Sequence, residues 1–406
     1  MNETVIIGAG QGAVEVAFGL RANGYQGSVH IIGEEAYPPY QRPPLSKGYL
    51  LGDIAQERLF FKDKAIYEDA GIDLSLATKV IAVDSEAQIV RFDNSKELRF
   101  DNLILATGSR PRLLPLEGAD ASNIFSLRSM QDIHAIQNYM QKGSKLTIIG
   151  GGYIGLELAA VGAKLGLEVH VVEMMPRLLA RVARAQTAAL LHQKHAENGV
   201  HILLETGVNG LVHKENKVQA VALSDGSELP TDFVVVGIGA IPNQELAVEA
   251  GVKCANGILI DENCATSIKN IYAAGDVSCF QHPRYGDIRL ESVGNAIDQG
   301  QRIAQAICKK EVKSPAMPWF WSDQYDYKMQ SAGLVMHDNV EIITRKGERE
   351  NAQSLWIYDD KGLLSVEAVN DPKSYLMGKR WLEQGISPDK NAIMDESVNL
   401  KECPVF

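Results

Sequence analysis

"LTIIGGGYIGLELAAVGAKLGLEVHVVE", from Leu146 to Glu173, is the stretch of sequence that decides the fold. An apolar strand leads into a glycine turn, an apolar helix follows, and a second apolar strand ends on an acid. The same order opens the chain in "TVIIGAGQGAVEVAFGL", from Thr4 to Leu20, and continues in "SVHIIGEE", from Ser28 to Glu35. The chain therefore contains two copies of one strand–turn–helix–strand unit.

The two copies are in register. Gly8 and Gly150 are 142 positions apart, as are Gly10 and Gly152, and a third small residue follows each pair. Such glycines let backbone N–H groups approach a pyrophosphate, and the helix N-terminus favours its charge. We therefore predict an α/β fold with two Rossmann-like dinucleotide-binding domains.

An acid follows the second strand of each copy. Glu173 comes 21 residues after Gly152, where a carboxylate accepts ribose hydroxyls and repels a 2′-phosphate, so NADH is expected rather than NADPH. In the first copy Gly33 takes the corresponding position, which leaves Glu34 and Glu35 as alternatives. Arg181 lies close behind Glu173 and could soften the repulsion.

The residue composition of the chain changes after Pro315. Aromatic residues crowd "PWFWSDQYDYKMQSAGL", a hairpin is expected around 359–362, and a helix is expected from Pro372 to a stop at Gly385. We predict a discontinuous first domain over 1–111 and 242–320, a second domain over 112–241, and a C-terminal α+β domain over 321–406.

Composition narrows the function classes. The net charge of −11 argues against nucleic acid or an anionic membrane as the main partner. No apolar run approaches the roughly 20 residues that span a bilayer, and no signal peptide is recognisable, so we expect a cytoplasmic protein. The five cysteines form no C-x-x-C and no pairing with histidine at metal-ligand spacing, so no metal site is expected.

Four motifs together resemble one family. The paired fingerprints, "YQRPPLSK" (Tyr40–Lys47), "ILATGSRPR" and "IYAAGDV" are similar to those of the FAD- and NADH-dependent ferredoxin reductases. This family includes putidaredoxin reductases, rubredoxin reductases and the reductase components of ring-hydroxylating dioxygenases. It has the fold of glutathione reductase. The resemblance covers nearly the whole chain.

The resemblance implies that the first copy binds FAD and the second binds NAD. Carried over by motif, the FAD contacts are Gly8, Gly10, Ala13, Glu34 or Glu35, Arg42, Lys47, Val80, Ala106, Thr107, Arg110, Asp276, Val293 and Trp319. The implied NAD contacts are Gly150, Gly152, Tyr153, Ile154, Gly155, Glu157, Glu173, Arg181 and Gly239.

Lys47 and Glu157 are the expected catalytic pair. The resemblance places Glu157 at the nicotinamide carboxamide, yet an acid inside the apolar helix "IGLELAAVGA" is costly without a partner. Lys47 is the candidate partner. Trp319 and Trp321, with Val293, are expected to wall the flavin, whereas His195 is expected to be a solvated helix residue.

Cysteine usage separates the branches of this fold. Disulfide reductases keep a cysteine pair near the flavin and NADH peroxidases keep one cysteine, but here no cysteine precedes Cys254. Electrons are therefore expected to pass from NADH through FAD to an outside carrier, a [2Fe-2S] ferredoxin or a rubredoxin, that serves a cytochrome P450 or a dioxygenase. The alternatives are a monodehydroascorbate-reductase-like or general NADH:acceptor reductase, and a redox-switched binding protein resembling apoptosis-inducing factor.

The carrier should dock on a basic patch at the flavin edge, because ferredoxins are usually acidic and this chain is acidic too. The candidates for the patch are Arg289, Arg302, Lys309, Lys310 and Lys328.

We expect the protein to be a monomer or a weak homodimer.

Overall fold

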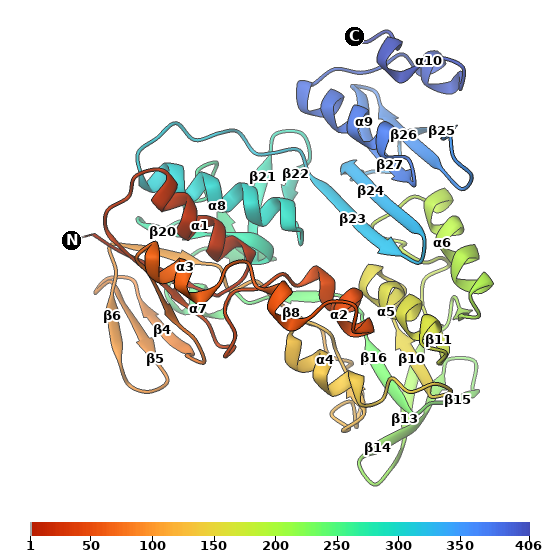
Figure 1. Cartoon of the computed structure of the whole chain (residues 1–406), viewed down its shortest axis with the longest axis horizontal. Coiled ribbons are helices and arrows are strands. Elements are labelled where there is room, and N and C mark those ends of the chain that lie inside the picture. The colour runs from red at the N-terminus through yellow and green to blue at the C-terminus, as the bar shows by residue number, and fades with distance from the viewer. Residues whose placement is uncertain (1) are drawn as a thin grey trace.

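The computed structural model describes residues 2–406 and shows three parts (Figure 1). The first part combines the red and orange N-terminal chain with the teal segment that returns to it, and the second part is the yellow and green segment between them. The third part is the blue C-terminal segment. This arrangement confirms the predicted α/β fold with a C-terminal α+β domain.

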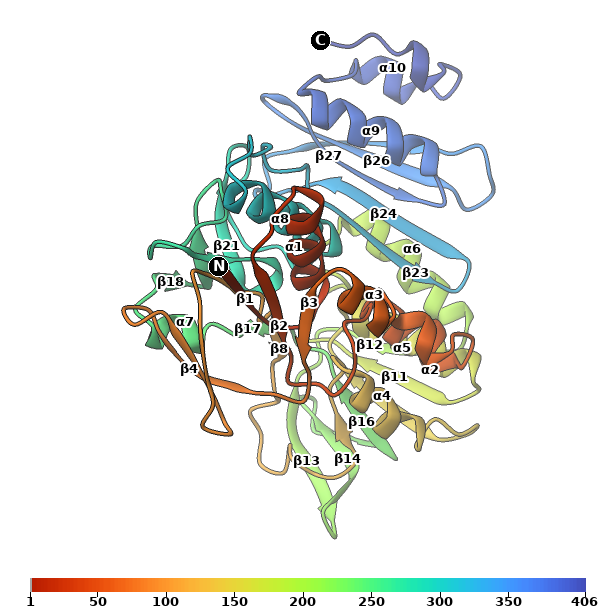
Figure 2. The same cartoon turned by 60° about the vertical axis from the view of Figure 1, so that its left-hand side comes forward.

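The first part is built on a parallel sheet in the order β20-β7-β1-β2-β3. Because β20 comes from the returning segment and pairs with β7, the sheet is discontinuous in sequence. Helices α1 and α8, one from each segment, pack side by side (Figure 2). The sheet strands are β1 (Glu3–Ile7), β2 (Ser28–Ile32), β3 (Ile72–Ser75), β7 (Asn102–Leu105) and β20 (Ile271–Ala273), and the two helices are α1 (Gln11–Ala22) and α8 (Val293–Ile307).

Smaller elements complete the first part. They are α2 (Gly48–Leu51), α3 (Lys64–Asp69), α7 (Glu245–Glu249), β4 (Val80–Asp84), β5 (Ile89–Phe92), β6 (Glu97–Arg99), β18 (Cys254–Ala255), β19 (Gly257–Ile260), β21 (Ser278–His282) and β22 (Gly286–Ile288). Strands β8 (Ser109–Pro111) and β17 (Ala240–Pro242) pair antiparallel where the chain leaves and re-enters this part.

The second part repeats the same architecture with the sheet order β12-β11-β10-β16-β9. Its sheet strands are β9 (Ile124–Phe125), β10 (Lys145–Ile149), β11 (Glu168–Val172), β12 (His201–Leu203) and β16 (Phe233–Val236). Its helices are α4 (Met130–Gln137), α5 (Tyr153–Lys164) and α6 (Ala185–Glu197), and a meander of β13 (Val208–Lys214), β14 (Lys217–Leu223) and β15 (Glu228–Pro230) covers one side.

The third part is an antiparallel sheet in the order β23-β24-β27-β26-β25 with α9 against it. The predicted hairpin lies between β26 and β27, and α9 starts after an Asp371 cap and stops at Gly385 in a left-handed conformation, both as expected. Strand β23 begins at Trp319, two residues before the predicted start of this domain at 321, and residue 1 of the predicted first domain lies outside the described residues. The elements are β23 (Trp319–Gln324), β24 (Tyr327–Gly333), β25 (Glu341–Lys346), β26 (Gln353–Asp359), β27 (Gly362–Val369), α9 (Pro372–Gln384) and α10 (Lys390–Met394).

The core explains the apolar runs around each glycine turn. Strands of parallel sheets are covered on both faces, so β1 and β10 are buried almost throughout. One hydrophobic cluster runs through all three parts, because it includes Tyr49 of the first part, Leu156 of the second and Met329 of the third. Among residues 2–406, no helix is both long and apolar enough to span a membrane.

Candidate active site

The two glycine turns have the same geometry. Gly8 and Gly150 adopt φ values of +112° and +110°, in the region that favours glycine. A Cβ on Gly8 would lie 2.1 Å from the Ala106 carbonyl oxygen, and one on Gly150 would lie 2.5 Å from the Gly237 carbonyl oxygen. Each turn is therefore held tightly against the neighbouring strand end, which leaves no room for any other residue.

The helix after each turn starts without a side-chain cap. Gly10 and Gly152 are the N-caps of α1 and α5, neither helix has an acid in its first turn, and a Cβ on either glycine would meet nothing within 4 Å. Both helices thus begin without a side-chain cap, and the space beside each N-cap Cα atom is open. Both sites fit the pyrophosphate of a dinucleotide.

The acids after the second strands differ in their bonding. Glu173 accepts hydrogen bonds from the backbone N–H groups of Gly151 (2.7 Å) and Met175 (2.8 Å), which orients the carboxylate beside the second turn. Both oxygens of Glu35 are already bonded, to Arg42 at 2.7 Å and to the Tyr40 hydroxyl at 2.5 Å. Glu34 is exposed.

Asp276 lies where three segments of the chain meet. Its carboxylate accepts from the Ser109 hydroxyl and the Arg128 guanidinium, each at 3.0 Å. Arg128 also brings its carbonyl oxygen within 2.7 Å of Arg42. The predicted contacts Arg42 and Asp276 are therefore connected through Arg128, a residue that sequence reasoning missed.

The remaining predicted FAD contacts lie in several places within and beside the first part. Thr107 donates to the Asn243 carbonyl at 2.7 Å, and Arg110 pairs with Glu245 at 2.7 Å, so both lie at the crossing between the first and second parts. Trp319 lies over the start of α8, because a Cβ on Gly294 would touch its indole ring. Ala13 and Val80 are buried, Ala106 follows β7, and Val293 is the first residue of α8.

The remaining predicted NAD contacts gather around the second turn. Tyr153 packs against Phe320 with ring centroids 4.6 Å apart, and Ile154 is half exposed although it is apolar. The Arg181 guanidinium lies 3.8 Å from the position of a Cβ on Gly239. Gly155 is in close contact with the turn itself, because a Cβ there would lie 2.4 Å from the Gly150 carbonyl oxygen.

Lys47 and Glu157 form the predicted ion pair. The Lys47 ammonium lies 2.8 Å from the Glu157 carboxylate, whose side chain is only 5% exposed. The hydroxyls of Ser46 (2.5 Å) and Ser322 (2.6 Å) donate to the same carboxylate. Ser46 belongs to the RPPLSK motif and could have been found there, whereas nothing in the sequence points to Ser322.

The predicted docking patch needs correction. Arg302 is 2% exposed and donates to Asp298 at 3.2 Å and to the Glu262 carbonyl, so its assignment to an exposed patch is wrong. Arg289 pairs with Glu291 at 2.6 Å and its side chain is only 12% exposed.

The predicted lysines of the patch are separated. Lys309 and Lys310 are exposed, but they follow the C-terminus of α8, and a helix of 15 residues places them roughly 22 Å from Val293. Lys328 is exposed on β24 and is opposite Asp323 on β23. The five residues therefore do not form one surface.

His195 also differs from its predicted role. It is fully buried and bonds to Gln324 of the third part at 2.8 Å, whereas the sequence suggested a solvated residue. Burial lowers the pKa of this imidazole to about 4, so it is neutral at physiological pH.

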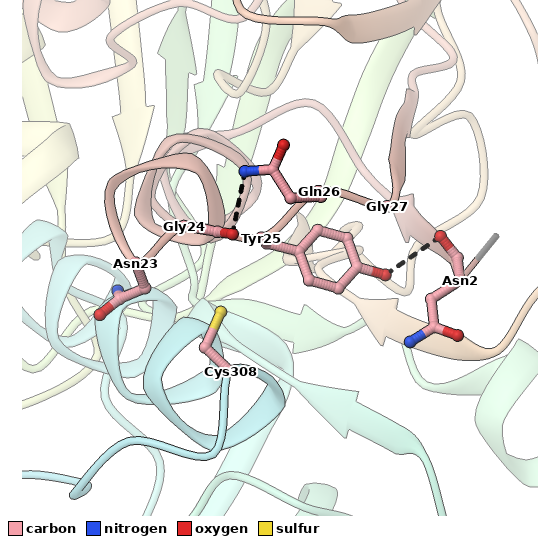
Figure 3. A pocket seen from close by; sticks show the side chains of 7 residues that line it. All are labelled: Asn2, Asn23, Gly24, Tyr25, Gln26, Gly27 and Cys308. Carbon is pink, nitrogen blue, oxygen red and sulfur yellow. Dashed lines mark hydrogen bonds between the residues drawn. The ribbon is translucent and has the colours of Figure 1, made fainter.

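A surface hollow of about 410 Å³ lies away from the two turns (Figure 3). Asn2, the loop 23–27 and Cys308 line it, so it lies at the C-terminal ends of α1 and α8. The pKa of the Cys308 thiol is raised by burial, which makes the thiol less reactive. All five cysteines are free, and within residues 2–406 no group of three His, Cys, Asp or Glu side chains is arranged to hold a metal ion.

The fold, the two glycine turns and the comparisons with known proteins identify a flavoprotein oxidoreductase that uses FAD and NAD(H). The chain belongs to the pyridine nucleotide-disulphide oxidoreductases, whose family model matches residues 2–300, and residues 319–404 match the reductase C-terminal family. Its resemblance to the FAD- and NADH-dependent ferredoxin reductases is thereby supported by two independent segments.

Named relatives are similar over almost the whole chain. Rhodocoxin reductase of Rhodococcus erythropolis is 37% identical, with 98% of this chain and 93% of the relative covered. Putidaredoxin reductase CamA of Pseudomonas putida is 38% identical, with 99% and 96% covered. The reductase in the crystal structure of the covalent putidaredoxin reductase–putidaredoxin complex is 38% identical, with a TM-score of 0.95 and 99% and 97% covered.

Proposed function

We propose that this protein passes electrons from NADH through FAD to a one-electron iron–sulfur carrier, a ferredoxin or a rubredoxin, that serves a cytochrome P450 or a ring-hydroxylating dioxygenase. The observation that carries the proposal is the buried Lys47–Glu157 pair, which connects the two nucleotide-binding parts without a cysteine beside it. No thiol relay is available there, so the acceptor is an outside carrier. The carrier-linked names of the relatives agree with this.

The first two parts of the chain bind different cofactors in this proposed function. Residues 1–111 and 242–320 hold FAD, which supplies the redox chemistry when bound, and residues 112–241 hold NADH. Either Glu34, which is exposed, or Glu35, which is bonded to Arg42 and Tyr40, accepts the FAD ribose hydroxyls. Glu173 accepts the NADH ribose hydroxyls and excludes a 2′-phosphate. Lys47 and Glu157 lie at the meeting point of flavin and nicotinamide. The proposed location of the protein is the cytoplasm.

The cofactor is tested first. Purified protein should be yellow with one non-covalent FAD per chain, and denaturation should release FAD rather than FMN, because each turn is built for an adenine dinucleotide. Release of FMN, or failure to take up flavin on reconstitution, would refute the assignment of the first turn.

The acceptor is tested by NADH-driven reduction of cytochrome c with and without a panel of ferredoxins and a rubredoxin. A strong dependence on one carrier, falling as salt rises, is the expected result. Equal rates with and without every carrier, together with fast reduction of small acceptors, would instead identify a general NADH:acceptor reductase.

A further inference from the structure

Strand β23 alternates its side chains between the other two parts of the molecule. Trp319 and Trp321 stack on each other with centroids 5.5 Å apart, and Trp319 lies against the start of α8. Phe320, Ser322 and Gln324 point the opposite way, toward α5 and α6 of the second part. The strand is thus wedged between the two nucleotide-binding parts.

A continuous chain of hydrogen bonds leads from the buried face of this strand to Glu157. The Tyr325 hydroxyl contacts His195 Nδ1 at 3.2 Å, and His195 Nε2 contacts Gln324 Oε1 at 2.8 Å. Gln324 Nε2 donates to the Ser322 hydroxyl at 3.1 Å, and that hydroxyl donates to Glu157 Oε1 at 2.6 Å.

Every bond in this chain runs in the same direction. Because the Gln324 amide nitrogen donates to Ser322, its oxygen faces His195, and the imidazole must carry its proton on Nε2. Nδ1 is then free to accept from Tyr325. Bonds aligned in this way polarise one another, and here the polarisation ends on the carboxylate.

The chain is shielded from water along most of its length. Ser322 and His195 are fully buried, Gln324 is 2% exposed and Glu157 is 5% exposed. A buried polar group that loses its hydrogen-bond partner destabilises the fold, so each residue of this chain is expected to keep its hydrogen bond. The other carboxylate oxygen accepts from Ser46 and Lys47, so donors from the first and third parts hold Glu157 of the second part.

We propose that Ser322, Gln324 and His195 are positioning residues that fix the Glu157 carboxylate for NADH, so that the C-terminal domain sets the geometry of hydride transfer. The inference rests on the proposed function, because Glu157 is placed there beside the nicotinamide. Small errors in the position of a group at the reacting centre have large effects on rate, so the whole chain of bonds matters.

The test uses the FAD-loaded full chain with S322A, Q324M and H195L, which remove successive links. S322T keeps the hydroxyl and is the rescue variant. D323A is the matched control, because Asp323 is the exposed neighbour on the other face of β23. For each variant, calorimetry gives the Kd of NAD⁺ for the oxidised protein, and stopped-flow absorbance gives the rate of flavin reduction at saturating NADH.

The expected effects decrease along the chain. Removing a hydrogen bond to a buried charge should lower the reduction rate ~10-fold in S322A, and the effect should be roughly 3-fold in Q324M and smaller again in H195L. The Kd of NAD⁺ should rise in the same order, with S322T near wild type. If S322A and Q324M match D323A in both measurements and only melt at a lower temperature, the positioning role is refuted. If wild-type flavin is not reduced by NADH at all, the proposed function fails instead.

Discussion

At the scale of single residues, Glu173 is the side chain expected to determine the preference for NADH over NADPH. Backbone bonds from Gly151 and Met175 hold its carboxylate next to the second turn, where the proposed function has it repel a 2′-phosphate. E173A should narrow the preference for NADH over NADPH by roughly 10-fold, mostly through the KM for NADPH.

The control for this substitution is E168A, at an exposed acid at the start of β11, the strand that Glu173 follows. The measurement is the steady-state kcat and KM of each variant with NADH and with NADPH. If the wild type uses NADPH better than NADH, the role assigned to Glu173 is wrong.

His195 predicts a pH dependence of stability. Burial lowers its pKa from 6.5 in the unfolded chain to about 4 in the folded protein. Between these values the unfolded state binds a proton that the folded state excludes, so the contribution is complete above pH 6.5 and is lost as the pH falls toward 4. Lowering the pH from 7 to 5 should cost about 1–2 kcal/mol through this residue.

The measurement is urea unfolding of wild type and H195Q at pH 7 and pH 5. The wild type should lose more stability than H195Q over this interval, because only the wild type carries the buried imidazole. Identical losses in wild type and H195Q would contradict the assignment.

The sequence alone predicted the pairing of some buried charged or polar side chains but not the burial of others. Lys47 and Glu157 were paired correctly, because an acid in an apolar helix needs a partner and one lysine lay in a diagnostic motif. Arg302 and His195 were misplaced because their partners, the Glu262 carbonyl and Gln324, come from distant segments. Residue type predicts that such side chains are exposed, but only tertiary packing supplies the bonds that allow their burial.

At the scale of elements, the contact between α5 and its glycine turn is the tightest feature of the NAD site. A Cβ on Gly155 would lie 2.4 Å from the Gly150 carbonyl oxygen, a backbone atom that cannot turn aside. G155A should therefore push the helix N-terminus away from the turn. We expect weaker NAD⁺ binding, roughly 10-fold, because the N–H groups to which we assign the pyrophosphate would move together.

The matched control is G207A in the same part, where a Cβ would make an ordinary contact of 3.6 Å with Ser224. Calorimetry with NAD⁺ and the flavin content of the purified protein are the two measurements. G155A should retain its FAD, because the first turn is separate. Equal NAD⁺ affinity in G155A and G207A would show that the helix tolerates the displacement.

Elements were easier to predict than their contacts. The glycine turns, the strands before them and the cap and stop of α9 follow from local sequence, and each was found where expected. The wedge position of β23 was not predicted, because alternation along a strand indicates two faces without identifying the neighbours of either.

At the scale of the whole molecule, two lysine–carboxylate pairs connect the first part to α5 of the second. Lys47–Glu157 is 2.8 Å long, with side chains 21% and 5% exposed. Lys164–Asp53 is 3.8 Å long, with side chains 63% and 64% exposed. The same two parts are thus joined by one largely buried pair and one exposed pair, which form a natural comparison.

The buried pair should be strongly coupled and the exposed pair should not. In a double-mutant cycle with K47M and E157Q, each single change leaves the other group buried without its partner, which should cost about 2–3 kcal/mol of unfolding free energy. The double variant should cost clearly less than the sum of the two. The cycle with K164M and D53N should show little coupling, because water screens that pair. Flavin reduction by NADH should slow in K47M and E157Q but not in K164M or D53N, since the proposed function assigns only the buried pair to the meeting point of flavin and nicotinamide. Equal coupling in both cycles, with unchanged reduction rates, would mean that Lys47–Glu157 is a structural link rather than part of the site.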